Sequence, residues 1–226
     1  MTLLTEPTRI VLSRTQLIPA VLGEPWGGGY FAGYISHTAD GNPTHALIVA
    51  PRATGATGTG YTLTTNLQCK TTATTTAGTD SPFDGAANTA AIITAGIADH
   101  PAAQFCADLN TGGFDDWYLP ATAELDIAFF HLKPGNVNNF LGYGINAYAV
   151  PKRDSNWTSA YPTQTYLTAF ASGGTEPFAE GRHWASNQTT ASRGGAVDYL
   201  NGFQGVSSSF TKTNLHRVRA FRRIAL

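Results

Sequence analysis

The sequence predicts a single domain of the α+β class, on three observations. The 226 residues have a hydrophobic fraction of 42%, with four Trp, nine Tyr and 12 Phe, which is enough for one large packed core. Two stretches in the middle of the chain carry apolar residues at helical spacing. The rest consists of short β-rich runs between Gly-rich and polar tracts, without a repeat of fixed period. We therefore expect two helices among short antiparallel sheets and long loops.

The two helices are predicted over 100–110 and 122–135. In the first helix, one face carries Ala102, Phe105, Cys106 and Leu109 behind a favourable Pro101. In the second helix, the corresponding face carries Leu125, Ala128, Phe129 and Leu132. Thr122 is a suitable N-cap, Glu124 suits the positively polarised first turn, and Pro134-Gly135 ends the second helix.

The predicted strands begin with a hairpin. Its arms are 28–36 and 44–51, and Asp40-Gly41 between them is a turn signal. The Thr/Gly-rich stretch 53–85 lacks helical periodicity, so it is predicted as loops with one strand near 61–67. Further along the chain, strand character is found in 156–160, 182–188, 194–205 and 215–226.

Composition and charge argue against several function classes. Only 13% of the residues are charged and the net charge is −1, so there is no electrostatic footprint for nucleic acid. No run approaches 18 consecutive apolar residues, so membrane insertion is not expected. Glu6, Arg9 and Arg14 interrupt the N-terminal apolar stretch, which argues against a secretory signal and for folding in a cytoplasm. Cys69 and Cys106 permit one bridge, but two reduced thiols are favoured.

The sequence contains no arrangement of residues that is typical of catalysis, cofactor binding or metal binding. The stretch 55–60 lacks the order of a phosphate-binding loop, the six histidines have no metal-binding spacing, and no serine-nucleophile motif occurs. Asp115 and Asp116 could form a paired-carboxylate site for acid–base catalysis. However, the side chains of adjacent residues diverge, and an Asp before a Trp at a loop–strand junction more often caps backbone amides. We therefore expect no enzyme activity, no catalytic residue, no cofactor and no metal.

Four arginines gather near the C-terminus. The predicted strand 215–226 contains Arg217, Arg219, Arg222 and Arg223, and Lys212 lies just before it. A cationic surface patch is one interpretation of this cluster. The favoured interpretation is a closing strand whose arginines pair with carboxylates and carbonyls of neighbouring loops.

The tract 184–214 has the composition of a recognition surface. It is dense in Asn, Ser, Thr, Gly and Gln, and it includes Arg193, Tyr199, Phe203 and Phe210. Short polar side chains with a few rigid aromatic anchors are typical of antibody paratopes. An inert surface loop is the alternative interpretation.

Four blocks of the sequence, taken in order, resemble a known family. They are DGAANTAAII (84–93), PAAQFCADLNTGGFDDWYLPATAEL (101–125), HWASNQ (183–188) and RVRAFRR (217–223). Together they resemble C-type-lectin-like domains of Legionella collagen-like adhesins, of variable proteins of diversity-generating retroelements and of phage tail receptor-binding proteins. The resemblance implies a C-type-lectin-like fold over 26–226, in which Trp117, Leu119 and Pro120 are core and turn residues and Asp116 fixes the loop.

In this family the binding surface lies in the C-terminal tract before the last strand, and retroelement-diversified members vary this tract. Carried over by position, with 207–209 beside them, the receptor-binding residues implied by the resemblance are Trp184, Ser186, Asn187, Thr189, Thr190, Ser192, Arg193, Asp198, Tyr199, Asn201, Phe203 and Gln204. Trp184, Tyr199 and Phe203 would be the aromatic anchors of this surface, and the Asn, Ser and Thr side chains would add hydrogen bonds.

The function that the resemblance implies is attachment of a phage virion, through its tail fibre or tail tip, to a host cell-surface receptor, either a protein or a glycan. Analogy with tail fibres implies a homotrimer, contacts with other phage tail proteins and an attachment or assembly segment at 1–25. One alternative is a structural baseplate or tail decoration protein. Another is an enzyme of the formylglycine-generating type, which is disfavoured because no cysteine lies beyond Cys106. Calcium-dependent sugar binding is disfavoured because neither an EPN nor a WND motif occurs.

Overall fold

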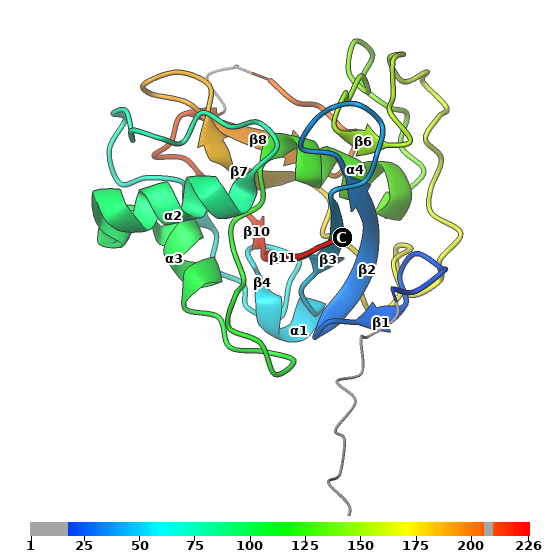
Figure 1. Cartoon of the computed structure of the whole chain (residues 1–226), viewed down its shortest axis with the longest axis horizontal. Coiled ribbons are helices and arrows are strands. Elements are labelled where there is room, and N and C mark those ends of the chain that lie inside the picture. The colour runs from blue at the N-terminus through cyan, green and yellow to red at the C-terminus, as the bar shows by residue number, and fades with distance from the viewer. Residues whose placement is uncertain (1–17, 206–209) are drawn as a thin grey trace, which may run out of the picture.

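The computed structural model describes residues 18–205 and 210–226. Within these ranges the chain forms helices and antiparallel strands, which agrees with the predicted α+β class. Its helices are α1 (Arg52–Gly55), α2 (Gly85–Gly96), η1 (Ile97–Asp99, a 3₁₀ helix), α3 (Pro101–Ala107) and α4 (Thr122–Leu132). The prediction of two helices is therefore too low. Figure 1 shows α2 and α3 together at the left and α4 at the upper right.

The main sheet has the strand order β1-β2-β3-β11, and β6 also pairs with β2. Its strands are β1 (Pro25–Trp26), β2 (Gly29–Ile35), β3 (His45–Val49), β6 (Ala149–Val150) and β11 (Phe221–Ala225). β2 and β3 confirm the predicted hairpin, with a bulge between Phe31 and Gly33. β11 pairs with β3 in antiparallel register from Phe221↔Val49 to Ala225↔His45. The C-terminal strand therefore closes the sheet beside the hairpin.

The described part of the chain also forms three smaller sheets with two antiparallel strands each. They pair β4 (Ala56–Thr57) with β10 (Val218–Arg219), β5 (Leu67–Gln68) with β9 (Leu215–His216), and β7 (Arg182–Gln188) with β8 (Gly194–Asp198). β7 confirms the strand predicted over 182–188, and β9, β10 and β11 together occupy the predicted closing strand. β8 ends at Asp198, earlier than the predicted 205.

The strand predicted near 61–67 forms only at the end of that stretch, as β5, and the strand predicted over 156–160 is wrong. In the first stretch, Leu63 makes an isolated bridge to Thr57, and a strand starts only at Leu67. In the second stretch, the Trp157 amide donates to the Tyr143 carbonyl, so the backbone bonds to a neighbouring loop. Both stretches have strand-like composition, but their backbone groups find partners outside a sheet.

α2 is a helix that hydrophobic periodicity does not predict. Its buried residues are Gly85, Asn88, Thr89 and Ile92, and of these only Ile92 is large and apolar. Asn88 Nδ2 donates to the Ser81 carbonyl at 2.7 Å and to Ser186 Oγ at 3.1 Å. Asp84 caps the helix by accepting from the Ala87 amide at 2.8 Å. A buried face made of small and polar residues gives no apolar signal, although its spacing is helical.

α3 and α4 confirm the two predicted helices, but Thr122 is not the cap of α4. Ala121 holds the N-cap position, and its amide donates to Glu124 at 2.7 Å, as in a capping box. The Thr122 hydroxyl donates instead to Asn187 Oδ1 at 2.7 Å. The start of α4 is therefore joined directly to β7.

Two buried clusters form the core, one on each face of β3. Leu47 and Val49 belong to the cluster that includes Leu125 and Phe129 of α4, whereas Ile48 belongs to the other cluster. Neighbouring residues of a strand point to opposite faces, so one strand serves both clusters. The second cluster also contains buried aromatic, aliphatic and thiol side chains: Trp26, Cys69, Cys106, Trp117, Leu119 and Trp184. Trp117 and Leu119 are therefore core residues as predicted, and neither cysteine is bridged.

The prediction that the C-terminal arginines pair with carboxylates and carbonyls of neighbouring loops is confirmed. Arg219 is fully buried, and its Nη2 donates to Glu176 Oε2 at 2.9 Å while its Nη1 donates to the Glu176 carbonyl. Arg222 forms an ion pair with Asp116. The aspartate of the GGFDDWYLP stretch thus ties its loop to the last strand, which is a structural role.

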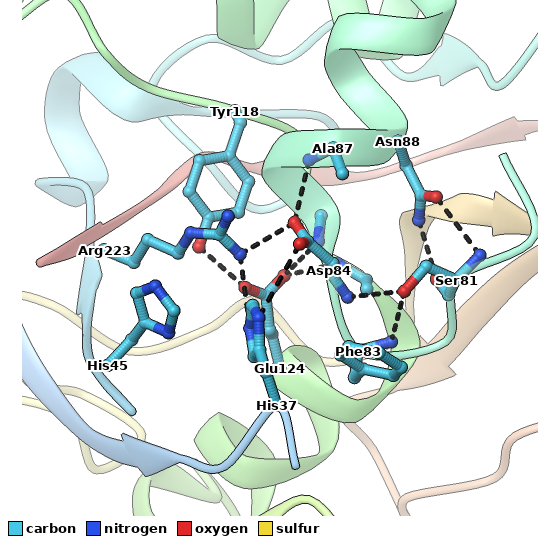
Figure 2. A network of polar contacts seen from close by, with 12 residues as sticks. His37, His45, Ser81, Phe83, Asp84, Ala87, Asn88, Tyr118, Glu124 and Arg223 are labelled. Atoms are coloured by element: carbon cyan, nitrogen blue, oxygen red, sulfur yellow. Dashed lines mark hydrogen bonds and ion pairs between the residues drawn. The ribbon is translucent and has the colours of Figure 1, made fainter. Parts of the chain in front are cut away.

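Figure 2 shows a network of polar contacts at the starts of α2 and α4. Glu124 is fully buried and accepts from the Tyr118 hydroxyl at 2.7 Å and from the Gly85 amide at 3.2 Å. Arg223 of β11 donates to the α2 cap, Asp84, at 2.7 Å. The network therefore ties both helix starts to the C-terminal strand. Burial raises the pKa of Glu124 to about 7, although its hydrogen bonds and the charge of Arg223 act in the opposite direction.

The described part of the predicted attachment segment, 18–25, packs on the domain. Ile18 and Leu22 contact the second core cluster, and the Gly23 amide donates to the Phe31 carbonyl at 2.7 Å. The boundary predicted between 25 and 26 falls inside β1, where Pro25 pairs with Tyr30. The remainder of the predicted segment, 1–17, lies outside the described residues.

Glu124→Gln tests the effect of the buried carboxyl group on stability. Since its folded-state pKa is raised, Glu124 contributes stability that is full below its ordinary pKa of 4.5 and is lost as the pH rises through about 7. A Gln side chain keeps an acceptor for the backbone amides and does not ionise. Between about pH 4.5 and pH 8, we expect the free energy of unfolding of the variant to rise by on the order of 3 kcal/mol relative to the wild type. Urea unfolding measured across this range checks the expectation, and parallel pH profiles of the two proteins would contradict it.

Candidate functional site

Four of the predicted receptor-binding residues are buried, so their assignment as receptor contacts is wrong. Two of these, Trp184 and Tyr199, are fully buried aromatic residues. Trp184 Nε1 donates to the Leu67 carbonyl at 2.8 Å. The Tyr199 ring stacks on Phe178 with a centroid distance of 4.0 Å, and its hydroxyl donates to the Leu125 carbonyl at 2.9 Å. Both aromatic residues are core residues whose polar atoms already have partners.

The other two buried residues, Ser186 and Asn187, connect β7 to the starts of two helices. Ser186 is 3% exposed and accepts from Asn88 of α2. Asn187 is 6% exposed, and its Oδ1 accepts from both the amide and the hydroxyl of Thr122 at the start of α4. Their polar groups therefore satisfy internal partners and are not offered to a ligand.

The remaining eight predicted residues are exposed or half-buried, and they lie in two places. The turn between β7 and β8 contains Thr189, Thr190, Ser192 and Arg193. The end of β8 and the segment after it contain Asp198, Asn201, Phe203 and Gln204. Residues 207–209, predicted beside them, lie outside the described residues. The second group adjoins exposed apolar side chains of the segment 138–145, which Phe203 contacts through Phe140 and Tyr143.

This apolar surface, which we call the aromatic patch, consists of Phe140, Leu141, Tyr143, Ile145, Leu200 and Phe203. Leu141 and Ile145 are each 61% exposed, Phe140 is 47% exposed and Leu200 is 37% exposed. Tyr143 and Phe203 are half-buried among them. Large apolar side chains that gather on a surface in this way mark an interaction site more often than an inert face.

Three aromatic rings join the two segments of the patch. The Phe203 ring lies 4.8 Å from Phe140 and 5.4 Å from Tyr143, measured between ring centroids, and both contacts are edge-to-face. The Phe140 amide also donates to the Asn201 carbonyl at 2.9 Å. The segments 138–145 and 199–205 therefore form one continuous surface.

Lys133, immediately after α4, fixes the base of the first segment. Its Nζ donates to the Val137 carbonyl at 2.6 Å, to Asn139 Oδ1 at 2.7 Å and to the Pro162 carbonyl at 3.2 Å. The side chain is 2% exposed, and burial lowers its pKa. The ammonium group thus gathers three oxygen atoms of the loops between α4 and β7, which Figure 1 shows at the upper right.

Asp126 of α4 fixes both segments of the patch at once. This side chain is buried, and its carboxylate accepts from Asn146 Nδ2 at 2.6 Å and from Gln204 Nε2 at 2.7 Å. It also forms an ion pair with Arg153, whose guanidinium lies 4.6 Å from the centre of the Phe130 ring. Gln204, predicted as a receptor contact, is therefore also a structural link between the patch and α4.

A pocket of about 170 Å³ opens beside the patch, between its two segments and α4. Ile145 and Tyr148 line it with apolar surface, and Asp126 and Gln204 line it with polar atoms. A concave site with mostly apolar walls and a few oriented polar groups suits non-covalent binding.

The cysteines of the protein are unsuited to nucleophilic chemistry. Burial raises the pKa of Cys69 to about 11 and that of Cys106 well above its ordinary value, so both thiols stay protonated at neutral pH. Nowhere in 18–205 or 210–226 do three or more His, Cys, Asp or Glu residues stand where they could hold a metal ion.

The first segment of the patch is not predicted from the sequence. Phe140, Leu141 and Ile145 lie in NNFLGYGINAY (138–148), where apolar residues are interrupted by Asn and Gly without a helical or strand period. Such a stretch is ordinarily assigned to a loop and set aside. The usable signal was the presence of several large apolar side chains in a loop that no periodic pattern assigns to the core.

Comparisons of the chain with family models, with curated proteins and with solved structures find no match. The described residues also include no helix with the length and apolar character needed to span a membrane. The C-type-lectin-like fold and the family therefore stay predictions, and the α+β class and the geometry of the patch are what the structure provides.

Asp126→Asn tests whether this carboxylate holds the patch together. The change removes the ion pair with Arg153 and replaces one acceptor oxygen by a donor that faces other donors. We expect a loss of roughly 3 kcal/mol in the free energy of unfolding, as for other broken buried pairs. Hydrogen exchange should become faster in 138–153 and 199–205 and stay unchanged in α2.

Asp154→Asn is the matched control, because Asp154 is an exposed carboxylate that pairs with Lys152 in the same loop. Its replacement should cost less than about 1 kcal/mol and leave exchange in the patch unchanged. Equal effects of the two substitutions on exchange in the patch would show that Asp126 has no special role.

Proposed function

We propose that the protein is a recognition module that binds its ligand through the aromatic patch. The observation that carries this proposal is the exposure of Phe140, Leu141 and Ile145 on loops held by buried polar contacts. Burying a Phe, Leu or Ile side chain is worth about 1.5–3 kcal/mol, so an inert loop would gain stability by turning them inward. A partner that covers the patch would provide the same stabilisation.

The rigid mounting of the patch supports this proposal. Lys133 and Asp126 fix both segments of the patch before any ligand arrives. Ordering side chains and loops on association is costly, so a preformed surface retains more of its contact energy as affinity. Asp198 and Asn201 add polar groups at the edge of the patch. With its apolar side chains in the middle, the patch therefore has the apolar centre and polar rim of a protein-binding surface.

We further propose that the ligand is a host cell-surface receptor and that the protein belongs to a phage tail fibre or tail tip. The support for this step is the resemblance of the four ordered sequence blocks to C-type-lectin-like receptor-binding proteins. Several copies on one tail, for example in a homotrimer, would raise the effective concentration of the patch and strengthen attachment even if each copy bound weakly.

The main alternative is a structural protein of the baseplate or tail. The apolar character of the patch also suits a permanent contact with another virion protein, because permanent interfaces are more apolar than transient ones. An enzyme of the formylglycine-generating type receives no support from the two buried, protonated thiols.

The combined substitution Phe140→Ser and Leu141→Ser tests the recognition function. Both side chains are exposed, so their removal takes apolar area from the patch with little effect on the core. We expect the affinity for receptor-bearing cells to fall at least about tenfold. The measurement is flow cytometry of labelled protein, displayed in several copies on one carrier, against a panel of bacterial strains.

The matched control is the combined substitution Ile93→Ser and Leu215→Ser, which removes exposed apolar side chains outside the patch. It should bind cells like the wild type. Equal loss in both double variants would contradict the role of the patch. Absence of cell binding, together with association with purified tail proteins that only the patch variant abolishes, would favour the structural alternative.

A further inference from the structure

Most arginines in the described residues are paired with a carboxylate. A carboxylate oxygen lies within 4 Å of a guanidinium nitrogen in the case of Arg153, Arg182, Arg219, Arg222 and Arg223. Arg52 and Arg217 have no Asp or Glu oxygen at that distance in 18–205 or 210–226. These two arginines line the same groove.

The groove has a volume of about 310 Å³, and its two guanidinium groups are oriented by adjacent backbone carbonyls. Arg52 Nη2 donates to the Gly60 carbonyl at 2.5 Å, and Arg217 Nε donates to the Thr59 carbonyl at 2.6 Å. The Arg52 guanidinium also lies 5.6 Å from the centre of the Tyr61 ring. Each guanidinium is therefore held in place through one nitrogen, and both are bound to the same loop, at Thr59 and Gly60.

The remaining nitrogen atoms of the two guanidinium groups have no hydrogen-bond acceptor among residues 18–205 and 210–226. No acceptor in the described chain takes the N–H groups of Arg52 Nη1 or of Arg217 Nη1 and Nη2, whereas Arg52 Nε is buried without a partner. A guanidinium has five donors in a planar fork, so one bond to a carbonyl leaves most of its capacity open. The lining of the groove also includes residues with small side chains, such as Gly173 and Pro177, which leave room for a ligand.

The groove carries a net positive charge. Glu180 is the one carboxylate among its lining residues, against the two guanidinium groups, and Glu180 forms no ion pair with either of them. Two uncompensated guanidinium groups facing one space attract an anion, and their planar geometry matches carboxylate and phosphate oxygens.

We propose that this groove binds an oxyanion, a carboxylate or a phosphate carried by an acidic saccharide, between Arg52 and Arg217. The groove shares no residue with the aromatic patch, so this proposal does not rest on the proposed function. The oxyanion oxygens accept from the unused nitrogen atoms of both guanidinium groups, and the rest of the ligand occupies the groove, whose lining also includes Gly173 and Pro177.

The test is isothermal titration calorimetry of the purified protein in a low-salt buffer without phosphate. The probes are D-glucuronate for the carboxylate source, glucose 6-phosphate for the phosphate source, and neutral glucose. We expect saturable binding of at least one charged probe and none of glucose. Binding of only one charged probe tells which source the groove selects.

Four variants tie the binding to the groove. Arg52→Ala and Arg217→Ala should each lower the affinity at least about tenfold, since each removes charged hydrogen bonds. Arg182→Ala removes the same charge outside the groove and should leave the affinity within about twofold. Glu180→Gln removes the opposing charge and should raise the affinity several-fold. Circular dichroism confirms that each variant is folded.

The proposal would be overturned by three results. The first is that neither charged probe binds the wild-type protein. The second is that Arg182→Ala weakens binding as much as the two groove substitutions, which would indicate general charge attraction. The third is an unchanged or lower affinity for Glu180→Gln. Because Phe140→Ser and Leu141→Ser lie outside the groove, their effect on cell binding is a separate outcome.

Discussion

The exposed surface of this protein depends on one buried carboxylate, that of Asp126. It lies on α4, whose apolar face belongs to the core, and it binds Asn146, Arg153 and Gln204 from two segments far apart in the sequence. A buried carboxylate is costly unless it is fully paired, so the arrangement is stable only when both segments are in place. The carboxylate thereby links the two segments of the aromatic patch to the core. The large apolar side chains of the patch can therefore stay in solvent without collapsing onto the core.

Polar residues of the C-terminal tract serve two purposes that composition alone does not separate. Asn187 and Ser186 face inward, where they satisfy groups at the starts of α4 and α2. Thr189 and Thr190 face solvent in the next turn. Short polar side chains suit both a ligand surface and a buried helix start, because in each case they meet backbone or side-chain groups that need a partner. The change from one role to the other takes place within a few residues of β7.

The sequence predicted the parts of the fold that follow from local pattern. The hairpin of β2 and β3, the apolar faces of α3 and α4, and the paired arginines of the closing strands all have signals within a short window. α2 escaped prediction because its buried face includes Asn88 and Thr89, whose partners lie elsewhere in the chain. Trp184 and Tyr199 were predicted on the surface because the family resemblance indicates the binding segment. It does not indicate which face of a strand in that segment is buried. The aromatic patch needed Phe140 and Phe203 to meet, and no local pattern predicts that contact.

The cost of burial explains why Arg52 and Arg217 have no carboxylate partner among the described residues. Arg217 and Arg219 are two residues apart on the closing strands, yet only Arg219 is fully buried, and it has Glu176 beside it. An unpaired guanidinium in the position of Arg219 would cost several kcal/mol, roughly the penalty for a buried uncompensated charge, so its carboxylate is a requirement of folding. Arg217 is half-buried at the edge of a groove, where water offsets most of that cost. Folding therefore imposes no carboxylate on Arg217 or Arg52, and their charge remains available for an anion from outside the chain.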